Sequence, residues 1–275
     1  MTRYFRGWTF GHLLLLLGGL VMLFPMVWML LSAFKTEQEM FDYPPQLLPK
    51  RFTLEVLQYM WGQRNFSRMF VNSTIVAAVV TTLTVATSAY IGFVFAKFRF
   101  RFREGLFYFV IATMMIPLPV LLIPHFQIVS WLGWVNTYQG LIAPFALSAF
   151  GIFLMRGFMI DFPDELIEAA RIDGASALRT FVMIVLPTMA PACAALGIIT
   201  FLHQWESLLW PIVVANQSDM QTLSVGLASL TSQTAENSSL MNPFAGAFIA
   251  AAPLVIMFLL FQRHIIQGIA ITGLK

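Results

Sequence analysis

Residues 161–181 read DFPDELIEAARIDGASALRTF, and the density of charged side chains sets this stretch apart from the rest of the chain. The whole chain is 59% hydrophobic and only 11% charged. Long apolar blocks lie on both sides of the stretch, at residues 139–160 and 182–214. The sequence therefore predicts a short polar segment that lies at a membrane surface and connects two membrane-spanning segments.

Local signals in this segment predict a helix, a turn and a second helix. Asp161 is a candidate N-cap, Pro163 suits the first turn, and Asp164 suits the positive end of a helix. Gly174 permits a sharp turn because it has no Cβ atom. Ser176 can cap the second helix, which leads into the next apolar block.

The first helix is expected to carry a narrow apolar face with small residues, formed by Leu166, Ala169, Ala170 and Ile172. Three charged residues, Glu168, Arg171 and Asp173, would flank this face. A simple solvated loop is the alternative. The length of the segment and the small apolar face instead favour a helix that docks in the groove of a partner, with the flanking charges fixing its register.

Composition assigns the chain to the membrane class. Soluble domains are usually about half apolar and about a quarter charged. This chain of 275 residues has 27 Phe and 16 Met, and its mean hydropathy is +0.78. The single cysteine, Cys193, lies in an apolar run, which excludes an internal disulfide and a multi-cysteine metal site. We expect no metal site in this chain.

The apolar blocks predict six membrane spans, at about 8–34, 69–95, 106–129, 139–160, 182–214 and 244–261. Each should be helical, because a spanning segment must satisfy its own backbone hydrogen bonds. The first block is too long for a signal-peptide core, so we expect it to be retained. The prediction is an all-α membrane protein with one transmembrane domain over residues 1–275 and a surface segment at 161–180, between spans four and five.

The positions of Lys and Arg predict the orientation. If the N-terminus is cytoplasmic, eleven of the sixteen basic residues lie on the inner side and five lie in the outer loop 35–68. This bias predicts that both termini are cytoplasmic. The stretch KFRFRFRE, 97–104, could be a nucleic-acid surface. An interfacial turn, with Phe rings in lipid and Arg side chains at phosphates, is favoured because the stretch joins two spans.

The charged segment also resembles a known family. Glu168-Ala169-Ala170, Gly174 four residues later, and Leu186-Pro187 are similar to the EAA signature of permease subunits of binding-protein-dependent ABC importers. Further stretches resemble the carbohydrate-type branch, of which the maltose-type permease is the familiar member: FPMVWMLLSAFK at 24–35, VNTYQGLIAP at 135–144, FGIFLMRGFM at 150–159 and WESLLWP at 205–211. The resemblance covers nearly the whole chain.

The resemblance implies a division of labour. In such importers two permease subunits, here expected to be a heterodimer, form the pathway in the bacterial cytoplasmic membrane. Two ATPase subunits bind ATP and Mg²⁺, and an extracellular binding protein delivers the substrate. The residues that match the signature would couple the permease to the ATPase: Glu168, Ala169, Ala170, Arg171, Asp173, Gly174, Leu186 and Pro187. The chain itself has no G-x-x-x-x-G-K-[ST] motif, so ATP hydrolysis is expected on another polypeptide. Membrane lipid is a further expected partner, and nucleic acid is not.

A second candidate site lies in the fifth span, in FLHQWESLLWP at 201–211. An ionised carboxylate such as Glu206 at membrane depth costs about 2.5–3.5 kcal/mol, so it should face a partner or a wet cavity. His203 would share its helix face, and Trp210 would lie one turn further along. The predicted substrate pathway is His203, Gln204, Trp205, Glu206 and Trp210. A purely structural contact between Glu206 and His203 is the alternative.

Hydrogen-bonding and aromatic side chains in this site suit a sugar or another polyol. The family often has Trp-Asn where this chain has Trp205-Glu206, and a fixed carboxylate would disfavour anionic cargo. Permeases for glycerol-phosphate-type compounds are similar, so such cargo is an alternative. A stand-alone secondary transporter is a second alternative, although internal repeats, which such carriers commonly have, are missing. An intramembrane enzyme is a third, but the sequence offers no convincing nucleophile and base.

Overall fold

The computed structural model describes residues 2–40, 42–62, 64–237 and 241–272, and within these ranges every regular element is helical. The N-terminal half contains α1 (Thr2–Ser32), α2 (Glu37–Met40), α3 (Glu55–Gly62), α4 (Phe66–Lys97), α5 (Arg103–Thr113), α6 (Leu118–Trp131), α7 (Tyr138–Ile142) and the 3₁₀ helix η1 (Ala143–Phe145). The C-terminal half contains α8 (Ala149–Ile160), α9 (Asp164–Ile172), α10 (Ala177–Thr180), the π-helix η2 (Phe181–Val185), α11 (Leu186–Thr188), α12 (Ala190–Glu206), α13 (Leu209–Val214), α14 (Leu223–Asn237) and α15 (Met241–Thr272). The all-α prediction is confirmed for the described residues.

The chain forms two compact units. Unit 1 comprises residues 1–67 and 226–253, and unit 2 comprises residues 68–225 and 254–275. In unit 1, the buried Lys35 donates from Nζ to the Gln46 carbonyl at 2.6 Å and lies over the Trp28 ring at 4.6 Å. Phe34 packs edge-on against Phe248 at 5.1 Å between centroids. The loop that follows α1 is therefore tied to the end of that helix, and α3 forms within the same stretch of chain.

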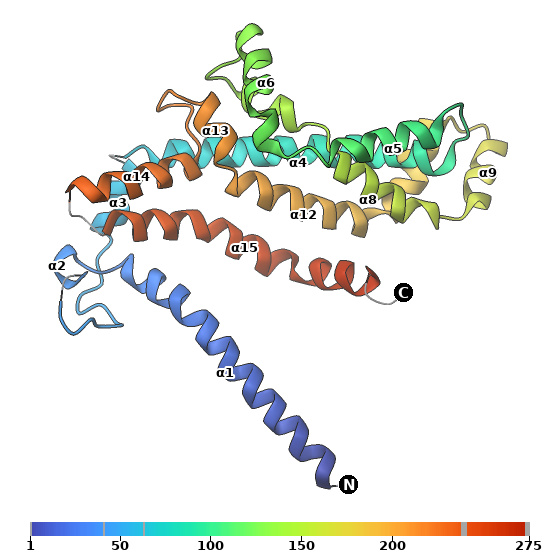
Figure 1. Cartoon of the computed structure of the whole chain (residues 1–275). Coiled ribbons are helices and arrows are strands. Elements are labelled where there is room, and N and C mark those ends of the chain that lie inside the picture. The colour runs from blue at the N-terminus through green and yellow to red at the C-terminus, as the bar shows by residue number, and fades with distance from the viewer. Residues whose placement is uncertain (1, 41, 63, 238–240, 273–275) are drawn as a thin grey trace. The chain divides into compact units, whose positions relative to one another are not determined.

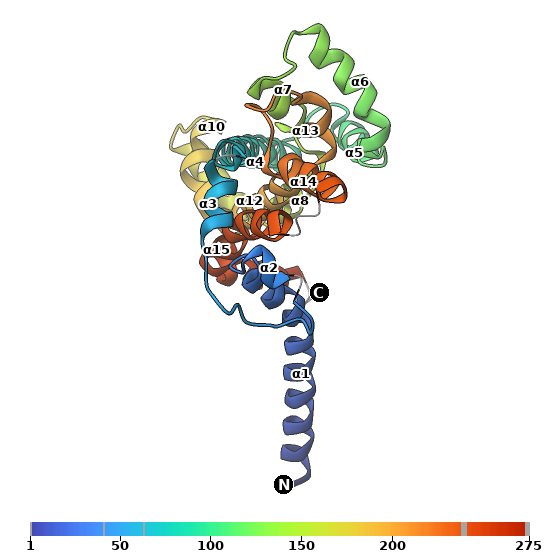
Figure 2. The ribbon, with the colours of Figure 1, turned by 90° about the vertical axis from the view of Figure 1, so that its left-hand side faces the viewer.

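Unit 2 is built around α4, α8 and α12, which lie side by side in both ribbon views (Figures 1 and 2). Glycine lets α4 approach α8 closely, because a Cβ atom at Gly92 would meet the Arg156 amide nitrogen at 2.8 Å and one at Gly151 would meet the Ser88 hydroxyl at 2.3 Å. Such small-residue contacts are typical of helix packing in membranes. The small residues at these positions therefore allow α4 and α8 to pack closely.

A cluster of buried apolar side chains forms the core of unit 2 near the start of α9. Its members come from α4, α8, the α8–α9 connection, η2 and α12: Ala89, Phe93, Met155, Met159, Phe162, Phe181, Val185, Ala192 and Leu196. A second cluster joins α4, α6, α7 and α13 around Trp210. The buried Asn72 joins α4 to α7 and to the connection between α13 and α14. Its amide donates to the carbonyls of Asp219 and Gln221, and its oxygen accepts from the Tyr138 hydroxyl at 2.7 Å.

Three of the predicted spans are bent rather than straight. The helix direction bends by 98° between α5 and α6, by 44° between the α7–η1 segment and α8, and by 79° between the α10–α11 segment and α12. A proline, which cannot donate a backbone hydrogen bond, lies within two residues of each break: Pro117 is the N-cap of α6, Pro144 lies in η1 and Pro187 lies in α11. The three prolines of the stretch 116–124 predict the kink in the span at 106–129, whereas the bends in the spans at 139–160 and 182–214 were not expected.

Two helical stretches among the described residues, Gly11–Ser32 and Phe66–Lys97, are long and apolar enough to cross a membrane unaided. The number rises to five if each bent pair counts as one span, and Pro243–Met257 is a shorter apolar stretch within the sixth predicted span. The stretch 215–243, which is rich in Ser, Thr, Gln and Asn and reads as a polar loop in the sequence, contains the whole of helix α14.

Candidate functional site

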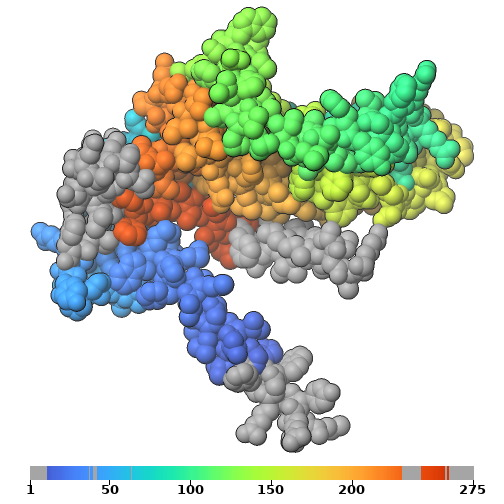
Figure 3. All heavy atoms as spheres, in the orientation of Figure 1, coloured from blue at the N-terminus to red at the C-terminus, as the bar shows by residue number. Residues whose placement is uncertain are grey.

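The charged segment folds as the sequence predicted, as a short helix followed by a turn. Helix α9 lies at one end of unit 2, and its atoms reach the surface there (Figures 1 and 3). The turn depends on Gly174, which has a φ of 77° and donates its N–H to the Arg171 carbonyl at 3.0 Å. Ser176 then caps α10, because its hydroxyl accepts from the Arg179 amide at 3.3 Å.

The start of α9 differs from the prediction. Asp161 is the C-cap of α8, and α9 begins at Asp164 with Pro163 in the N-cap position and without a side-chain cap. Pro163 explains the shift, since a residue before proline, here Phe162, is held away from helical geometry. The first helix is therefore shorter than a start after Asp161 would make it.

The predicted apolar face of α9 is divided between two sides of the helix. Ala170 is 4% exposed, so it faces the interior of its own chain. Leu166 and Ile172 are 46% and 86% exposed, and Ala169 is also exposed. The expectation that Ala169 and Ala170 both face a partner is wrong for Ala170, because the two residues are 100° apart on the helix and the inner side packs against unit 2.

Of the remaining predicted coupling residues, four are exposed on α9 or on the turn that follows it, and two lie on α11. Glu168, Arg171, Asp173 and Gly174 are all exposed. Leu186 packs against the cluster around Phe93, whereas Pro187 is exposed at the start of α11. The outer surface of α9 thus combines three apolar side chains with both signs of charge, as a docking helix requires.

The predicted pathway residues are separated in the structure. Helix α12 ends at Glu206, so the helical spacing that was expected to relate Glu206 to Trp210 does not apply. Trp210 is instead on α13, 1% exposed, and its Nε1–H donates to the Gly140 carbonyl at 3.0 Å. The edge of its ring packs against His125.

Trp205 is also buried, at 4% exposed. Its ring stacks on Phe201 at 5.8 Å and meets the edge of Phe70 at 5.6 Å. Both indoles therefore pack within unit 2. The prediction that they line a pathway is corrected, because in this chain they contribute to the packed core. Near them, Gln204 is half-buried, and the Trp205 carbonyl accepts from the Ser224 hydroxyl.

His203 and Glu206 present exposed side chains. In the part of the chain that the structure describes, these two side chains do not form a hydrogen bond or an ion pair with each other, so the structural contact that was the alternative is not formed there. These two residues and Gln204 are the members of the predicted pathway that can face solvent, a partner or cargo.

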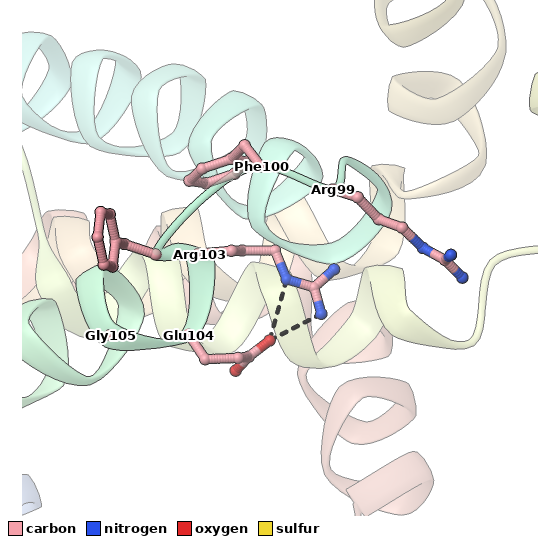
Figure 4. A pocket seen from close by; sticks show the side chains of 6 residues that line it. Arg99, Phe100, Arg103, Glu104 and Gly105 are labelled. Atoms are coloured by element: carbon pink, nitrogen blue, oxygen red, sulfur yellow. Dashed lines mark hydrogen bonds and ion pairs between the residues drawn. The ribbon is translucent and has the colours of Figure 1, made fainter.

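Residues 97–105, which follow α4, form the turn that the KFRFRFRE stretch suggested. Phe102 is 70% exposed, and the Arg101 guanidinium lies over its ring at 4.9 Å. Arg99, Arg103 and Glu104 line an open hollow of about 420 Å³ together with Phe100, Phe102 and Gly105. Figure 4 shows Arg103 turned toward Glu104 and Arg99 pointing away from them. The exposed Phe102 ring and the Arg99 side chain, which points away from Glu104, fit an interfacial turn.

Sequence reasoning missed a group of charged residues near α9 that join helices. Glu104 pairs with Arg103 at 2.8 Å and with Arg156 at 3.1 Å, and Arg156 lies 3.9 Å from the centre of the Phe107 ring. Lys97 pairs with Asp164 at 2.7 Å. In the sequence analysis, Lys97 and Arg156 counted only among the basic residues that predict the orientation of the chain in the membrane. Their position at the ends of predicted spans was the available signal, but it does not name their partners.

Comparison with known proteins identifies the family of this chain. Residues 88–271 match the family described as "Binding-protein-dependent transport system inner membrane component". The chain is 33% identical to the arabinooligosaccharides transport system permease protein AraQ of Halalkalibacterium halodurans, over 93% of this chain and 92% of the relative. It is also 33% identical to the sn-glycerol-3-phosphate transport system permease protein UgpE of Yersinia pestis, over 94% and 95% of the two chains.

A solved structure has the same fold. A chain of a bacterial ABC transporter involved in the import of the acidic polysaccharide alginate superposes with a TM-score of 0.81. The match covers 94% of this chain and 96% of that chain, at 21% sequence identity. At this identity the likeness establishes the fold alone.

Proposed function

The chain belongs to the family of binding-protein-dependent transport system inner membrane components, and we propose that it is the permease subunit of an ATP-driven ABC importer for a carbohydrate or related polyol. The observation that carries this proposal is the outer surface of α9. Exposed Leu166, Ala169 and Ile172 form an apolar stripe on a helix whose inner side is already packed. Such a stripe fits a groove on a partner.

The coupling role rests on this stripe and on the charges around it. Glu168, Arg171 and Asp173 would rim the contact with the ATPase and set its register, since charged rims give specificity rather than bulk affinity. Gly174 would allow the turn after α9 without placing a side chain at the contact with the ATPase. Ala170 and Leu186 would act from inside the permease, by packing α9 and α11 against unit 2, whereas the exposed Pro187 would set the backbone at α11.

A cysteine cross-linking experiment tests the coupling role. Cys193 is the only cysteine in the sequence, so Cys193→Ala gives a cysteine-free background. In that background we expect Ala169→Cys to cross-link to the ATPase subunit, because Ala169 is exposed on α9. The adjacent Ala170→Cys is the matched control and should not cross-link, because Ala170 is 4% exposed.

Two results would contradict the coupling role. One is equal cross-linking by both cysteines, which would mean that the outer surface of α9 has no special contact with the ATPase. The other is labelling of Ala169→Cys by a membrane-impermeant maleimide added from outside intact cells, which would put α9 on the wrong side of the membrane.

The proposed assembly has two permease subunits, this chain and a second homologous one. Two separate ATPase subunits would bind ATP and Mg²⁺, and an extracellular binding protein would deliver cargo. The family description supports an inner membrane location and delivery by a binding protein. Within this assembly we propose that the chain crosses the bacterial inner membrane six times with both termini in the cytoplasm, as its distribution of basic residues favours.

The cargo is the finer part of the proposal. The relative named for arabino-oligosaccharides favours a carbohydrate, and the relative named for glycerol 3-phosphate supports an anionic polyol phosphate as the second candidate. The exposed Glu206 favours the neutral sugar, since a fixed carboxylate repels an anionic cargo unless it is protonated or paired. We propose that Glu206, His203 and Gln204 contact the cargo.

Titration calorimetry on the cognate extracellular binding protein tests the choice of cargo. We expect an arabino-oligosaccharide to bind and sn-glycerol 3-phosphate not to bind. In uptake by the complete importer, Glu206→Gln should change the concentration dependence for the sugar, while Glu55→Gln in the outer loop should leave it unaltered. Binding of glycerol phosphate alone would replace the first candidate by the second.

A further inference from the structure

We propose that Lys97 is a positioning residue that fixes the connection between α8 and α9 to the end of α4, so that α9 and α4 move together. We call residues 161–163, which connect α8 to α9, the elbow. This inference rests on the proposed function of α9 as the coupling helix. It adds the residue through which α9 is joined to the helices that cross the membrane.

The ammonium group of Lys97 uses all three of its donors on this connection. Nζ donates to the Ile160 carbonyl at 3.0 Å, to the Phe162 carbonyl at 2.5 Å and to a carboxylate oxygen of Asp164 at 2.7 Å. A lysine has three donors and no acceptor, so its hydrogen-bonding capacity is filled. One side chain on the last residue of α4 thus holds the last residue of α8, the elbow and the first residue of α9.

Burial separates this arrangement from an ordinary surface ion pair. The Lys97 side chain is 7% exposed, whereas that of Asp164 is 72% exposed. An exposed ion pair contributes about 0–1 kcal/mol. The Asp164 contact should therefore be the weaker part, and the bonds to the two carbonyls should be the stronger part. Loss of the Lys97 ammonium would leave the carbonyl at the C-terminal end of α8 without its cation, where a positive charge is favourable.

Apolar packing holds the same connection from its other side. Phe162 is 4% exposed and belongs to the buried cluster that includes Phe93 of α4, one turn before Lys97, and Met159 of α8. The elbow is therefore held to α4 by a buried ring and by a buried ammonium. A displacement of the elbow cannot leave α4 behind without breaking both contacts, and α9 starts directly after the elbow.

The test uses the complete importer, with its partner subunits and binding protein, in proteoliposomes. Uptake is measured with whichever of a labelled arabino-oligosaccharide and labelled sn-glycerol 3-phosphate the wild-type complex accumulates. ATP hydrolysis is measured in the same vesicles. For Lys97→Met we expect uptake per ATP hydrolysed to fall about tenfold, within the usual range of coupling between two sites.

Two matched variants separate positioning from simple loss of structure. Lys97→Arg keeps a cation that can donate to the carbonyls, so it should restore most of the uptake per ATP. Asp164→Asn removes only the exposed partner and should change that ratio by about twofold or less. A structural defect alone would lower uptake and hydrolysis together and would leave their ratio unchanged.

A covalent link provides a second measurement if Lys97→Met fails to assemble. The double variant Lys97→Cys and Asp164→Cys, in the Cys193→Ala background, is joined by a reducible bifunctional thiosulfonate. We expect low uptake per ATP in the reduced protein and recovery after cross-linking, because the link replaces the connection between α4 and α9.

Three results would overturn the role of Lys97: normal uptake by Lys97→Met, a parallel fall of uptake and hydrolysis that Lys97→Arg does not restore, or a cross-link that restores nothing. All three presuppose a wild-type complex that transports. A wild-type complex that shows no ATP-driven uptake would instead defeat the proposed function itself, so the two failures are distinguishable.

Discussion

The two ends of helix α9 are held by different kinds of interaction. At its N-terminal end the chain is fixed by long-range contacts, the buried Phe162 ring and the Lys97 ammonium. At its C-terminal end the chain turns at Gly174, which is exposed and has no atom of another residue near the position of a Cβ. The first end is set by tertiary structure and the second by local backbone geometry.

This difference has a mechanical consequence for a coupling helix. An end that is bonded to α4 transmits displacement, whereas an end that turns on a glycine in open space can change direction at little steric cost. Force applied to the outer surface of α9 should therefore pass into α4 and α8 more directly than into α12. The following variants break or sharpen this comparison, from the largest expected effect to the smallest.

Phe162→Ala should break the fixed end most severely. Removing a buried Phe side chain typically costs about 3–5 kcal/mol. We expect a clear fall in the Tm of the purified complex, measured by fluorescence-detected size exclusion after heating. Phe162→Leu, which keeps most of the apolar volume, is the control and should lose much less. An unchanged Tm for the alanine variant would show that the ring does not hold the elbow.

Gly174→Val should damage the turning end, through strain alone. A non-glycine residue in the left-handed region costs roughly 1–2 kcal/mol, and nothing within 4 Å of the Cβ position adds a clash. We expect uptake per ATP to fall in the reconstituted importer. Gly174→Asn is the matched control, since asparagine tolerates this conformation better. Equal behaviour of the two variants would argue against a required positive φ.

Ser176→Ala should loosen the helix that follows the turn. Its hydroxyl accepts from the Arg179 amide, and loss of an N-cap costs about 1 kcal/mol. Faster hydrogen exchange is expected at residues 177–180, with little change in α9. Ser176→Asp keeps a capping oxygen and should exchange at nearly the wild-type rate. Faster exchange in both variants would assign the effect to something other than the cap.

Ile172→Ala should have the smallest effect on stability. Its side chain is 86% exposed, and exposed substitutions usually change stability by less than about 0.5 kcal/mol. The Tm of the permease without its ATPase should therefore be unchanged, while co-purification of the ATPase should weaken. A stable complex in which ATPase binding is fully retained would remove Ile172 from the docking surface.

The comparison also shows which features the sequence could predict. The turn at Gly174 and the cap at Ser176 depend on neighbours within a few residues, so residue type and spacing were sufficient. The contacts of Lys97 join residues 63 to 67 positions apart. Which helices meet at that point is a property of the packed chain, and a basic residue at the end of a span signals only orientation.

The incorrect predictions have a related physical cause. The expectation for Trp210 assumed that helical periodicity continues past Glu206, but Ser207 has an extended ψ of 124° and ends α12. Similarly, the apolar runs at 139–160 and 182–214 gave no sign of a bend, because hydropathy does not register where the backbone turns. Asp161 was taken as the N-cap because its residue type fits, whereas Pro163 moved the start of α9 to Asp164.

The bend between α5 and α6 has a thermodynamic consequence for the chain as a solute of the bilayer. Pro117 and Pro119 have no backbone N–H to donate at the bend, and Met115 within it is 83% exposed. In hydrocarbon, an unsatisfied backbone group costs several kcal/mol, and irregular backbone is tolerated only where protein or water covers it. For a bend at membrane depth we therefore expect cover from a neighbouring protein surface, and this contact would favour assembly of the chain with a partner.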